Sequence, residues 1–418
     1  MSCSHYPEYS RGHMTKLCII MIGLPARGKS LMAERLREGL SADGLQVCVF
    51  NNGNLRRASL GYMSGAASFY HPDNEEGRML REKIASDNMQ LAREFLQGNG
   101  QVAILDATNG SRTRRAFLEK ELAGIPVLYV ECVNDDAELL ELSVKRKARL
   151  PEFGGMTRGE AVRSFSQRIE YYERIFVPLS RDNEKSYVRV GTLDNRILEE
   201  YGCDSVPFYI QIRDILVSDW IRNMFLVRHS QSQYNVDGRI GGDSPLTPRG
   251  VRQAEALARH FKDISIPYIF TSTSLRSGMT AAPLLEEHPD SQVIALRELD
   301  EINAGICDSM TYDEIREKMP EEYAARARNK YDYIYPGGEG YVTLKYRVAM
   351  GFRKALFLSG AAPGMLVIGH QAINRMILSL FMYRPNDAVP YIYVPQDEFF
   401  HIVATHRKKL LELVRFTG

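Results

Sequence analysis

Residues 17–41 read LCIIMIGLPARGKSLMAERLREGLS, and the order of residue types in this stretch decides the fold around it. An apolar run, Leu17 to Ile22, has the length and the β-branched content of a buried strand. It ends at Gly23, and a second glycine, Gly28, precedes Lys29 and Ser30. Apolar residues then recur at the spacing of one helix face, at Leu31, Met32, Leu36 and Leu40. Strand, glycine loop, Lys-Ser and helix in this order predict a phosphate-binding P-loop.

The residue types of this loop suit phosphate chemistry. Glycines let backbone N–H groups converge on phosphate oxygens, and the N-terminus of the following helix adds a partial positive charge. We expect Lys29 to reach the β- and γ-phosphates and the Ser30 hydroxyl to bind Mg²⁺. The alternative, a chance glycine turn, requires every position and both flanks to match by coincidence. The stretch therefore predicts a nucleotide-binding domain.

Length and net charge limit the number of domains and the kinds of partner. A chain of 418 residues is too long for one ordinary core, so we expect two domains. Fifty-three basic and fifty-two acidic residues give a net charge of +1, which provides no bulk field for nucleic acid or a membrane. We therefore expect small-molecule partners, no nucleic acid and no membrane.

Six scattered cysteines without a C-x-x-C pair suit a reduced compartment and argue against a zinc site or a disulfide framework. No apolar run approaches ~18 residues, and the N-terminus lacks the layout of a signal peptide. The expected location is the cytoplasm.

Several charged residues in the first half stand where α/β folds bind ligands. Arg56 and Arg57 follow a candidate strand at 45–51, although a solvated charge pair is the alternative. A buried strand at 102–105 ends at Asp106, the position that holds Mg²⁺ in P-loop enzymes, with a structural helix cap as the alternative. A basic run at 145–149 is either a solvated face or a lid that brings cations to phosphates.

Further strands are predicted at 125–133, 187–190 and 206–210, and a helix carries Arg168 and Tyr172 on one face. Alternation of strands and helices predicts an α/β fold with a mostly parallel sheet and helices on both faces.

The pattern restarts at residue 223, where a strand ends in Arg228-His229. A later strand ends in Thr271-Ser272 with Arg276 on the next helix, and another ends in His370. An imidazole attacks a phosphoryl group, arginines hold its oxygens bidentately, and a carboxylic acid such as Glu301 protonates the leaving oxygen. Either histidine alone is more often structural, but together at strand ends they predict a phosphohistidine-type phosphatase or mutase site.

A P-loop kinase followed by a histidine phosphatase resembles the family of bifunctional 6-phosphofructo-2-kinase/fructose-2,6-bisphosphatases. The resemblance covers about Lys16 to Val403 and rests on long phrases: GLPARGKS, FNNGNLRR, HPDN, LDATNGSRTRR, RIGGDS, LDEINAG, KYDYIYPGGEGY and HQAINR. It implies a P-loop kinase domain at 1–221 and an α/β histidine phosphatase domain, similar to phosphoglycerate mutase, at 222–418. It also implies a homodimer.

For the first domain, the resemblance implies transfer of the γ-phosphoryl group of ATP to the 2-hydroxyl of fructose 6-phosphate. Asp106 would lie near Mg²⁺, and Lys29 and Lys147 near the charge of the transition state. The nucleotide would be held by Gly23, Leu24, Pro25, Ala26, Arg27, Gly28, Lys29 and Ser30. The sugar phosphate would be held by Arg56, Arg81, Thr108, Arg114, Lys147, Arg168 and Tyr172.

For the second domain, the resemblance implies hydrolysis of fructose 2,6-bisphosphate. His229 matches the nucleophile and Glu301 the general acid, while Arg228, Arg276 and His370 match the pocket for the 2-phosphate. The fructose and its other phosphate would be held by Asn235, Gly241, Tyr312, Arg326, Lys330, Tyr341, Gln371 and Arg375.

Three features depart from the family pattern. The family motif usually runs Arg-His-Gly-Glu-Ser, and here Ser230 replaces the glycine, which gives clearance and unusual backbone angles next to a phosphate. Gln231 replaces the glutamate, which matters less because related phosphatases and mutases vary there. A cysteine near the nucleotide in many relatives matches Cys132 or Val133, depending on one gap. The ends of the chain are short, so control by phosphorylation of long tails is not expected.

Two alternatives to a balanced bifunctional enzyme remain open from the sequence. One is a kinase-dominant enzyme whose phosphatase is weakened by Ser230. The other is a regulatory protein that binds sugar phosphates without turnover, against which the intact nucleophile and acid argue, because binding alone needs neither.

Overall fold

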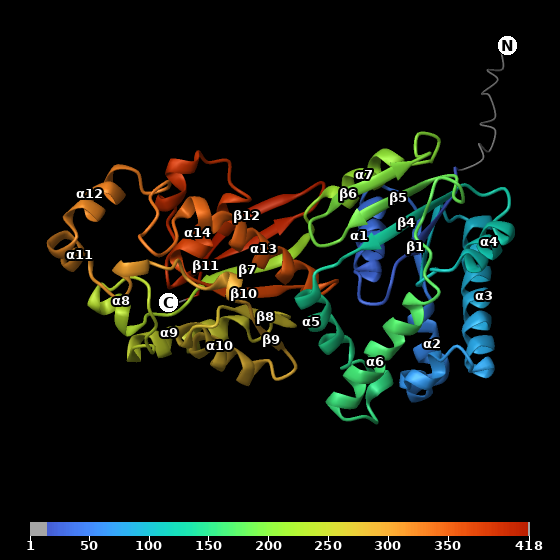
Figure 1. The fold of residues 1–418 in the computed structure, drawn as a ribbon, viewed down its shortest axis with the longest axis horizontal. Coiled ribbons are helices and arrows are strands. Elements are labelled where there is room, and N and C mark those ends of the chain that lie inside the picture. Colours follow the sequence, from blue (N-terminus) through green and yellow to red (C-terminus); the bar gives the residue numbers. More distant parts are fainter. Residues whose placement is uncertain (1–14, 417–418) are drawn as a thin grey trace, which may run out of the picture. The chain divides into compact units, whose positions relative to one another are not determined.

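The computed structural model describes residues 15–416, and the chain divides into two compact units, Met1–Ser218 and Asp219–Gly418 (Figure 1). We call them the N-terminal and the C-terminal unit. Within the described residues, no helix is both long enough and apolar enough to cross a membrane.

The sheet of the N-terminal unit is built around β1 (Leu17–Ile22), all six residues of which are buried. The strand order is β2-β3-β1-β4-β5-β6. The first five strands run parallel, and β6 pairs antiparallel with β5 at one edge. The other strands are β2 (Val47–Asn51), β3 (Val102–Asp106), β4 (Val127–Val133), β5 (Tyr187–Gly191) and β6 (Arg196–Tyr201).

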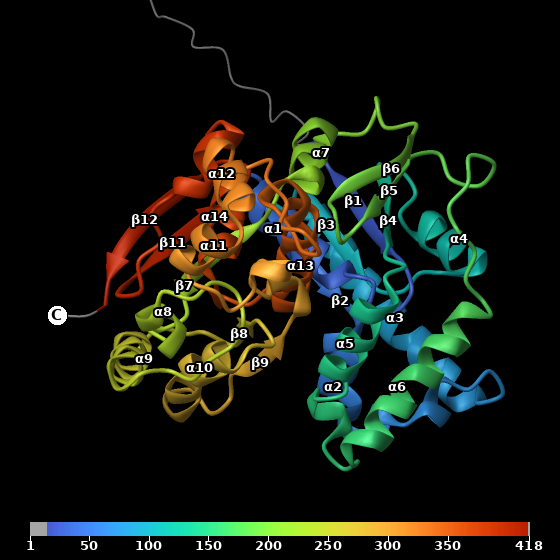
Figure 2. The same ribbon diagram turned by 60° about the vertical axis from the view of Figure 1, so that its left-hand side comes forward.

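Helices of this unit begin where a side chain caps the first turn. Ser111 caps α4, Asp136 caps α5, and Thr157 forms a reciprocal capping box with Glu160 at the start of α6. In Figures 1 and 2, α2, α5 and α6 gather together at one end of the sheet. The helices are α1 (Lys29–Ala42), α2 (Asn52–Leu60), α3 (Glu75–Gln97), α4 (Arg112–Glu121), α5 (Ala137–Lys147), α6 (Arg158–Glu173) and α7 (Tyr209–Val217), with 3₁₀ turns η1 (Gly61–Gly65), η2 (Ala67–Tyr70) and η3 (Pro151–Phe153).

The predicted strand at 206–210 is wrong. Phe208 adopts a left-handed conformation with φ of +61°, which breaks an extended chain, and α7 begins at the next residue. Only Tyr209 and Ile210 of that run belong to α7, and the inner face of this helix, Ile212, Ile215 and Leu216, is fully buried. Short apolar runs do not distinguish a strand from a buried helix by periodicity alone.

The C-terminal unit has a second six-stranded sheet in the order β12-β11-β7-β10-β8-β9. Strands β7, β10, β8 and β9 are parallel, and β11 runs antiparallel to both β7 and β12. The strands are β7 (Ile221–Arg228), β8 (Tyr268–Thr271), β9 (Gln292–Ala295), β10 (Met365–Gly369), β11 (Glu398–Ala404) and β12 (Lys409–Arg415). Each unit is therefore an α/β fold with a mostly parallel sheet, as the sequence predicts.

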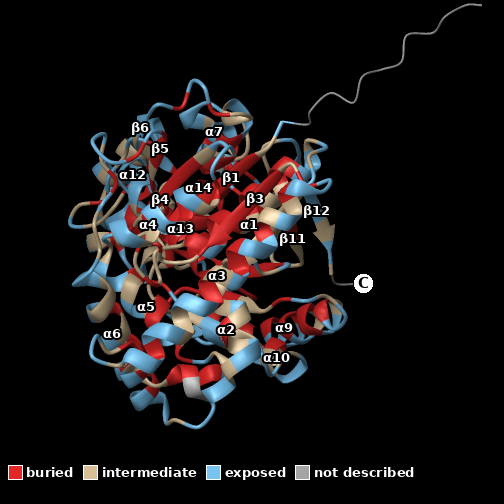
Figure 3. Cartoon of the chain, turned by 90° about the vertical axis from the view of Figure 1, so that its right-hand side faces the viewer, coloured by how far each residue is buried: buried red, intermediate tan, exposed pale blue. Residues whose placement is uncertain are grey.

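The second core lies between this sheet and its helices. Phe225, Phe261 and Phe399 pack edge to face or tilted, with ring centroids 4.9–5.8 Å apart. Figure 3 shows the buried residues concentrated on the strands and the exposed residues on the helices. The helices are α8 (Gln233–Asp237), α9 (Pro248–Phe261), α10 (Leu275–Glu287), α11 (Tyr312–Lys318), α12 (Pro320–Arg328), α13 (Tyr341–Ser359) and α14 (Gln371–Ser379), with η4 (Arg297–Leu299), η5 (Gly305–Cys307) and η6 (Asn386–Tyr391).

Register brings polar residues to one edge of each sheet. In the N-terminal unit, Asp106 pairs with both Asn51 and Met21 at the carboxyl ends of β3, β2 and β1. In the C-terminal unit, Arg228 pairs with Gly369 and Thr271 with Ile368. The residues that follow these ends in the chain must therefore leave the sheet side by side.

A buried ion pair holds the loop that follows Asp106. Arg115 Nε donates to Glu184 Oε1 at 2.7 Å, and both side chains are 3% exposed. Arg115 Nη1 also donates to the carbonyl oxygens of Gly110 at 3.1 Å and Val177 at 2.9 Å. This guanidinium joins three segments of the N-terminal unit.

We predict that Glu184→Gln lowers the free energy of unfolding of the N-terminal unit by about 3 kcal/mol, because it leaves the Arg115 charge buried without a counter-ion. Urea denaturation followed by hydrogen exchange of the β1 amides measures the change. Glu82→Gln, which breaks an exposed pair with Arg78, is the control and should cost less than about 1 kcal/mol. Equal effects of the two substitutions would contradict the prediction.

Candidate active sites

The loop between β1 and α1 depends on backbone conformations that most side chains resist. Gly23 has φ of +141°, and a Cβ there would lie 2.7 Å from the carbonyl oxygen of Cys132. Gly28, with φ of +88°, directly precedes α1. Ala26 adopts φ of +63°, a conformation that is costly for a residue with a side chain. Backbone strain of this kind is concentrated at ligand-binding sites.

Two cations stand at this loop. Lys29 is buried, and its Nζ donates to the carbonyl oxygen of Leu24 at 2.7 Å. Burial lowers the pKa of Lys29 to about 8, and Asp106 partly opposes the shift. Arg27 Nη1 is buried without a hydrogen-bond partner among the described residues, while Thr192 Oγ1 donates to the Arg27 carbonyl oxygen at 2.9 Å. An unpartnered cationic N–H at a helix N-terminus fits a polyphosphate.

Asn51 brings Ser30 and Asp106 together. Its Nδ2 lies 3.5 Å from Ser30 Oγ and donates to Asp106 Oδ2, while its Oδ1 accepts from the Asn54 backbone N–H at 2.8 Å and so caps α2. Asp106 is 3% exposed. It does not cap α4, because Ser111 does, so the structural alternative for Asp106 is wrong. A hydroxyl and a carboxylate close together fit a hard cation such as Mg²⁺.

Four predicted sugar-phosphate residues surround the ring of Tyr70. The guanidinium carbons of Arg168, Arg56 and Arg81 lie 4.3, 5.5 and 5.6 Å from its centroid. The Tyr172 ring centroid is 6.1 Å away. Such cation–π contacts hold guanidinium groups without consuming their N–H donors. Nε of Arg56 and Nε of Arg168 are buried without a hydrogen-bond partner among the described residues.

Glu152, at 2% exposed, binds two of these arginines, Arg56 and Arg168, and also Arg57. Its Oε2 accepts from Arg56 at 2.8 Å and from Arg57 at 3.2 Å, and its Oε1 accepts from Arg168 at 3.2 Å. Burial by itself raises the pKa of Glu152, but Arg56 and Arg168 outweigh it and lower the pKa below its ordinary value. The carboxylate therefore stays ionised and balances part of the positive charge.

The remaining predicted kinase residues border the same region. Thr108 accepts through its carbonyl oxygen from the Gly23 N–H at 3.2 Å. Burial lowers the pKa of the Arg114 guanidinium, and nearby Arg81 lowers it further, while Glu82 and Tyr172 oppose both. Burial lowers the pKa of Lys147 to about 8, with Arg146 and Arg57 adding to the effect. Within the basic run, Lys145 pairs with Glu141 on the exposed face, whereas Lys147 is half-buried.

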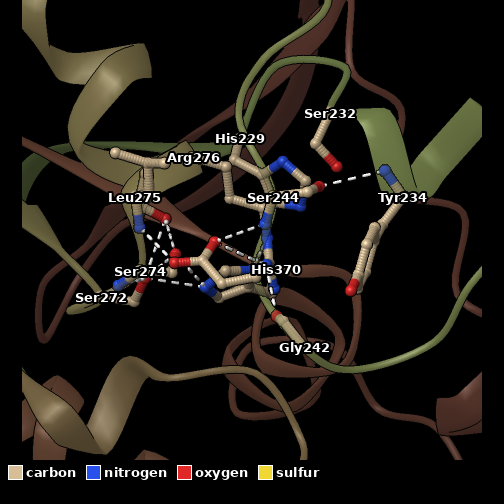
Figure 4. Close-up of polar contacts among 12 residues, drawn as sticks. His229, Ser232, Tyr234, Gly242, Ser244, Ser272, Ser274, Leu275, Arg276 and His370 are labelled. Atoms are coloured by element: carbon tan, nitrogen blue, oxygen red, sulfur yellow. Dashed lines mark hydrogen bonds and ion pairs between the residues drawn. The ribbon is translucent and has the colours of Figure 1, made fainter. Parts of the chain in front are cut away.

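In the C-terminal unit, three strand ends deliver the central groups of a cleft (Figure 4). His229 follows β7, His370 follows β10 and Ser272 follows β8. The two imidazole centroids are 5.0 Å apart, and both residues are buried, at 3% and 0% exposed.

Hydrogen bonds fix the protonation of His229. Its Nδ1 lies 2.8 Å from the carbonyl oxygen of Ser230, an acceptor, so Nδ1 carries the proton and donates. Nε2 is then left with its lone pair. Burial lowers the pKa of His229 well below its ordinary value, and Arg276 and Arg228 lower it further. A neutral imidazole with a free Nε2 is suited to attack phosphorus.

His370 has the opposite tautomer. Arg276 Nε donates to its Nδ1 at 3.3 Å, so its proton is on Nε2, which donates to Ser272 Oγ at 2.8 Å. Arg276 Nη1 donates in turn to the Gly242 carbonyl oxygen at 2.6 Å and to Asp243 at 3.0 Å. Arg228 Nε is buried and has no hydrogen-bond partner among the described residues. These donors fit a phosphoryl group beside His229.

Glu301 is held by backbone donors at the edge of the cleft. Its Oε1 accepts from the Ile302 N–H at 2.9 Å and its Oε2 from the Gln371 N–H at 3.1 Å. Burial raises the pKa of Glu301, although these contacts and the cations Arg276 and Arg228 oppose the shift. A raised carboxyl pKa is what a general acid needs near neutral pH.

The structure places every other predicted phosphatase residue at this cleft, whose volume is about 140 Å³. Arg326 donates to Tyr312 Oη at 2.7 Å and to Tyr335 Oη at 2.8 Å, and Arg375 donates to Tyr341 Oη at 3.1 Å. The lining includes Arg228, His229, Asn235, Gly241, Arg276, Glu301, Tyr312, Arg326, Lys330, Tyr341, Gln371 and Arg375.

Comparison with known proteins agrees with this geometry. A family model described as 6-phosphofructo-2-kinase matches residues 4–213, and one described as histidine phosphatase superfamily (branch 1) matches residues 224–417. A 6-phosphofructo-2-kinase/fructose-2,6-bisphosphatase from Gallus gallus is 36% identical over 389 residues, which cover 90% of this chain and 80% of the relative. The chain belongs to the 6-phosphofructo-2-kinase/fructose-2,6-bisphosphatase family.

Other members show similar coverage. A 6-phosphofructo-2-kinase/fructose-2,6-bisphosphatase from Caenorhabditis elegans is 34% identical, over 90% of this chain and 84% of the relative. A fructose-2,6-bisphosphatase from Saccharomyces cerevisiae is 32% identical, over 93% of this chain and 86% of the relative. Membership of the family implies a kinase that uses ATP and a histidine phosphatase in one chain.

Sequence reasoning missed four residues that the structure places at the two sites. Asn51 ends β2, and its register opposite Asp106 is the signal that could have found it. Tyr70, Glu152 and Gln396 each contact at least one partner far away in the chain, for example 96 residues between Glu152 and Arg56. No local pattern marks such contacts.

We predict that Glu152→Gln destabilises the N-terminal unit by about 3 kcal/mol, because three arginines lose their shared counter-charge. Inorganic phosphate should then raise the thermal midpoint of the variant more than that of the unchanged protein, since an anion takes over the lost charge. Calorimetry with increasing phosphate measures both effects. Glu141→Gln, at an exposed pair, is the control. An equal response to phosphate in variant and parent would contradict the prediction.

Proposed function

We propose that the chain is a bifunctional enzyme that makes and removes fructose 2,6-bisphosphate and thereby sets glycolytic against gluconeogenic flux. The observation that carries the proposal is the presence, in one chain of this family, of two complete and separate constellations. One joins Lys29 and Asp106 to the arginines around Tyr70, and the other joins His229 to Glu301 and an unpartnered Arg228.

In the N-terminal unit, the residues from Gly23 to Ser30 bind ATP, and the arginines with Thr108 and Tyr172 bind fructose 6-phosphate. The reaction needs positioning and charge more than a strong base. Lys29 and Lys147 stabilise the negative charge on the transferring γ-phosphoryl group as the 2-hydroxyl attacks it. Ser30 and Asp106 would hold Mg²⁺, which supplies charge neutralisation on the phosphate oxygens when bound.

In the C-terminal unit, His229 Nε2 attacks the phosphorus of the 2-phosphate while Arg228 and Arg276 hold its oxygens. His370 holds one of them when its Nε2–H turns from Ser272 Oγ to the phosphate. The bond from phosphorus to the sugar oxygen breaks, and the Glu301 carboxyl group gives that oxygen its proton, which releases fructose 6-phosphate. Water then attacks the phosphohistidine, the Glu301 carboxylate takes the water proton, and inorganic phosphate leaves. The other cleft residues hold the fructose and its 6-phosphate.

The kinase-dominant alternative is not favoured. Ser230 has a negative φ, so the position does not require glycine. Ser230 is 2% exposed, and its backbone N–H donates to Thr280 Oγ1 at 3.0 Å. We also propose that the protein is a cytoplasmic homodimer, as the family resemblance implies. The particle mass from sedimentation equilibrium would test the dimer.

A paired assay tests the function. One arm supplies ATP, Mg²⁺ and fructose 6-phosphate, and the other supplies fructose 2,6-bisphosphate labelled at the 2-phosphate. We predict turnover in both and a trapped phosphohistidine. Lys29→Ala should lower the kinase rate by about 100-fold or more and leave the phosphatase intact. His229→Ala should do the converse and trap no label. Loss of both activities in either folded variant would contradict two separate sites.

The role of Ser230 has its own test. We predict that Ser230→Gly leaves the phosphatase kcat and KM nearly unchanged, because the negative φ of Ser230 is one that any residue adopts. Steady-state hydrolysis of fructose 2,6-bisphosphate measures both constants, with the kinase rate of the same preparation as the folding control. A large gain in kcat would mean that this serine limits the phosphatase.

A further inference from the structure

The segment at 390–396, which we call the strap, runs from the end of η6 to the start of β11 along the phosphatase cleft. Its side chains alternate in exposure: Tyr391 and Tyr393 are 65% and 68% exposed, whereas Ile392 and Val394 are 9% and 4% exposed. This alternation is typical of an extended chain with one face on the core. The buried face anchors the strap to the C-terminal unit.

Alternate carbonyl groups of the strap each accept a hydrogen bond from a different cation of the cleft. Pro390 O accepts from Lys330 Nζ at 3.1 Å, Ile392 O from Arg375 Nε at 2.8 Å, and Val394 O from Arg228 Nη1 at 3.3 Å. Pro390 still lies in η6 and residues 392–395 have no regular structure, so these three contacts, and not a strand, show that the carbonyls face the cations. The strap is therefore a row of acceptors spaced to match three phosphate-binding side chains.

These contacts leave donors of each cation available for substrate. Arg228 keeps a buried, unpartnered Nε, and Lys330 uses one of its three N–H groups on Pro390. Lys330 also lies 4.8 Å above the ring of Tyr391, which belongs to the strap itself. Acceptors that fix a cation without neutralising it preorganise the cleft for anions.

The strap ends in Gln396, which contacts the nucleophile loop. Gln396 Nε2 donates to the carbonyl oxygen of His229 at 3.0 Å and to Asn235 Oδ1 at 2.9 Å, so both of its hydrogens are used. The His229 N–H donates to Gly369 O at 2.9 Å on the other side. The backbone of His229 is thus fixed at its N–H by the end of β10 and at its C=O by Gln396.

We propose that Gln396 is a positioning residue of the phosphatase, through which the strap sets the nucleophile His229 in register with the cations that hold the two phosphates of the substrate. The proposal rests on the proposed function. Gln396 touches no reacting atom; it acts through the His229 backbone and through Asn235. Displacing a catalytic group by about 1 Å can cost on the order of 100-fold in rate.

Two substitutions of Gln396 test the proposal in the full chain. Gln396→Met keeps the length and removes both donors; Gln396→Glu places a carboxylate against two acceptor oxygens. We expect phosphatase kcat and the burst of labelled phosphohistidine to fall about 10-fold or more in the first variant and further in the second. KM for fructose 2,6-bisphosphate should change less than kcat, because the cations keep their backbone acceptors.

The kinase rate of the same preparations is the internal control, since its residues lie in the other unit, and Gln233→Met is the matched control. Gln233 is exposed, and the one side-chain hydrogen bond that it makes among the described residues goes to Asp237. If Gln396→Met does not fold, the circular dichroism spectrum will show it, and Gln396→Asn, which keeps the amide but shortens its reach, takes its place with the same expected loss.

The outcomes distinguish failure of the strap proposal from failure of the proposed function. Unchanged burst and kcat in folded Gln396 variants overturn the strap proposal and leave the proposed function standing. A lower thermal midpoint with an unchanged burst per folded molecule also overturns it, because the residue is then only structural. Absence of phosphohistidine in the unsubstituted protein refutes the proposed phosphatase itself.

Discussion

Repulsion among buried cations is the constraint on which both sites depend. A phosphate-binding cleft must gather several guanidinium and ammonium groups where water screens them poorly, and it must keep them apart from one another before any anion arrives. The pKa values of Lys29, Lys147 and Lys330 are each lowered to about 8, chiefly by burial, and neighbouring arginines lower them further. Everything else in the two clefts can be understood as a way of holding positive charge in place.

The two units meet that constraint with different acceptors. In the N-terminal unit a single buried carboxylate, Glu152, is shared by three arginines, and the ring of Tyr70 contacts two of them, Arg56 and Arg168. In the C-terminal unit neutral carbonyl oxygens of the strap take most of that role, with Asp243 contributing one ion pair to Arg276. A carboxylate reduces the net charge that a substrate meets, whereas carbonyls direct the cations and leave their full charge. Two sites lined by similar cations can therefore present different electrostatic potentials to a substrate.

Local sequence patterns predicted the parts of this arrangement that the sheets themselves create. The P-loop, Asp106, His229 and His370 all follow strand ends, and parallel strands bring such ends to one edge, so their proximity could be read from the chain. Glu152 and Gln396 could not, because Glu152 lies 96 residues from Arg56 and Gln396 lies 167 residues from His229, in segments whose docking no periodicity encodes. The strand predicted at 206–210 failed for a related reason: the stretch contains the start of α7, which packs on α1, and only the left-handed Phe208 reveals where that helix begins. The family motif predicts that Ser230 weakens the phosphatase. The backbone angle at Ser230, which no motif encodes, shows that the position does not require glycine.

Asn51 couples the cation site of the N-terminal unit to helix α2. One atom of its amide group contacts the oxygens suited to a cation, and the other caps the helix that carries Arg56 and Arg57. An amide N–H cannot ligate a cation, so an ion shared by Ser30 and Asp106 would have to displace the Asn51 side chain from these oxygens. The same side chain caps α2, so its displacement would alter the cap. The free energies of nucleotide and sugar binding are then linked through one side chain. Such linkage is reciprocal: whatever one ligand does to the affinity of the other is returned in equal measure.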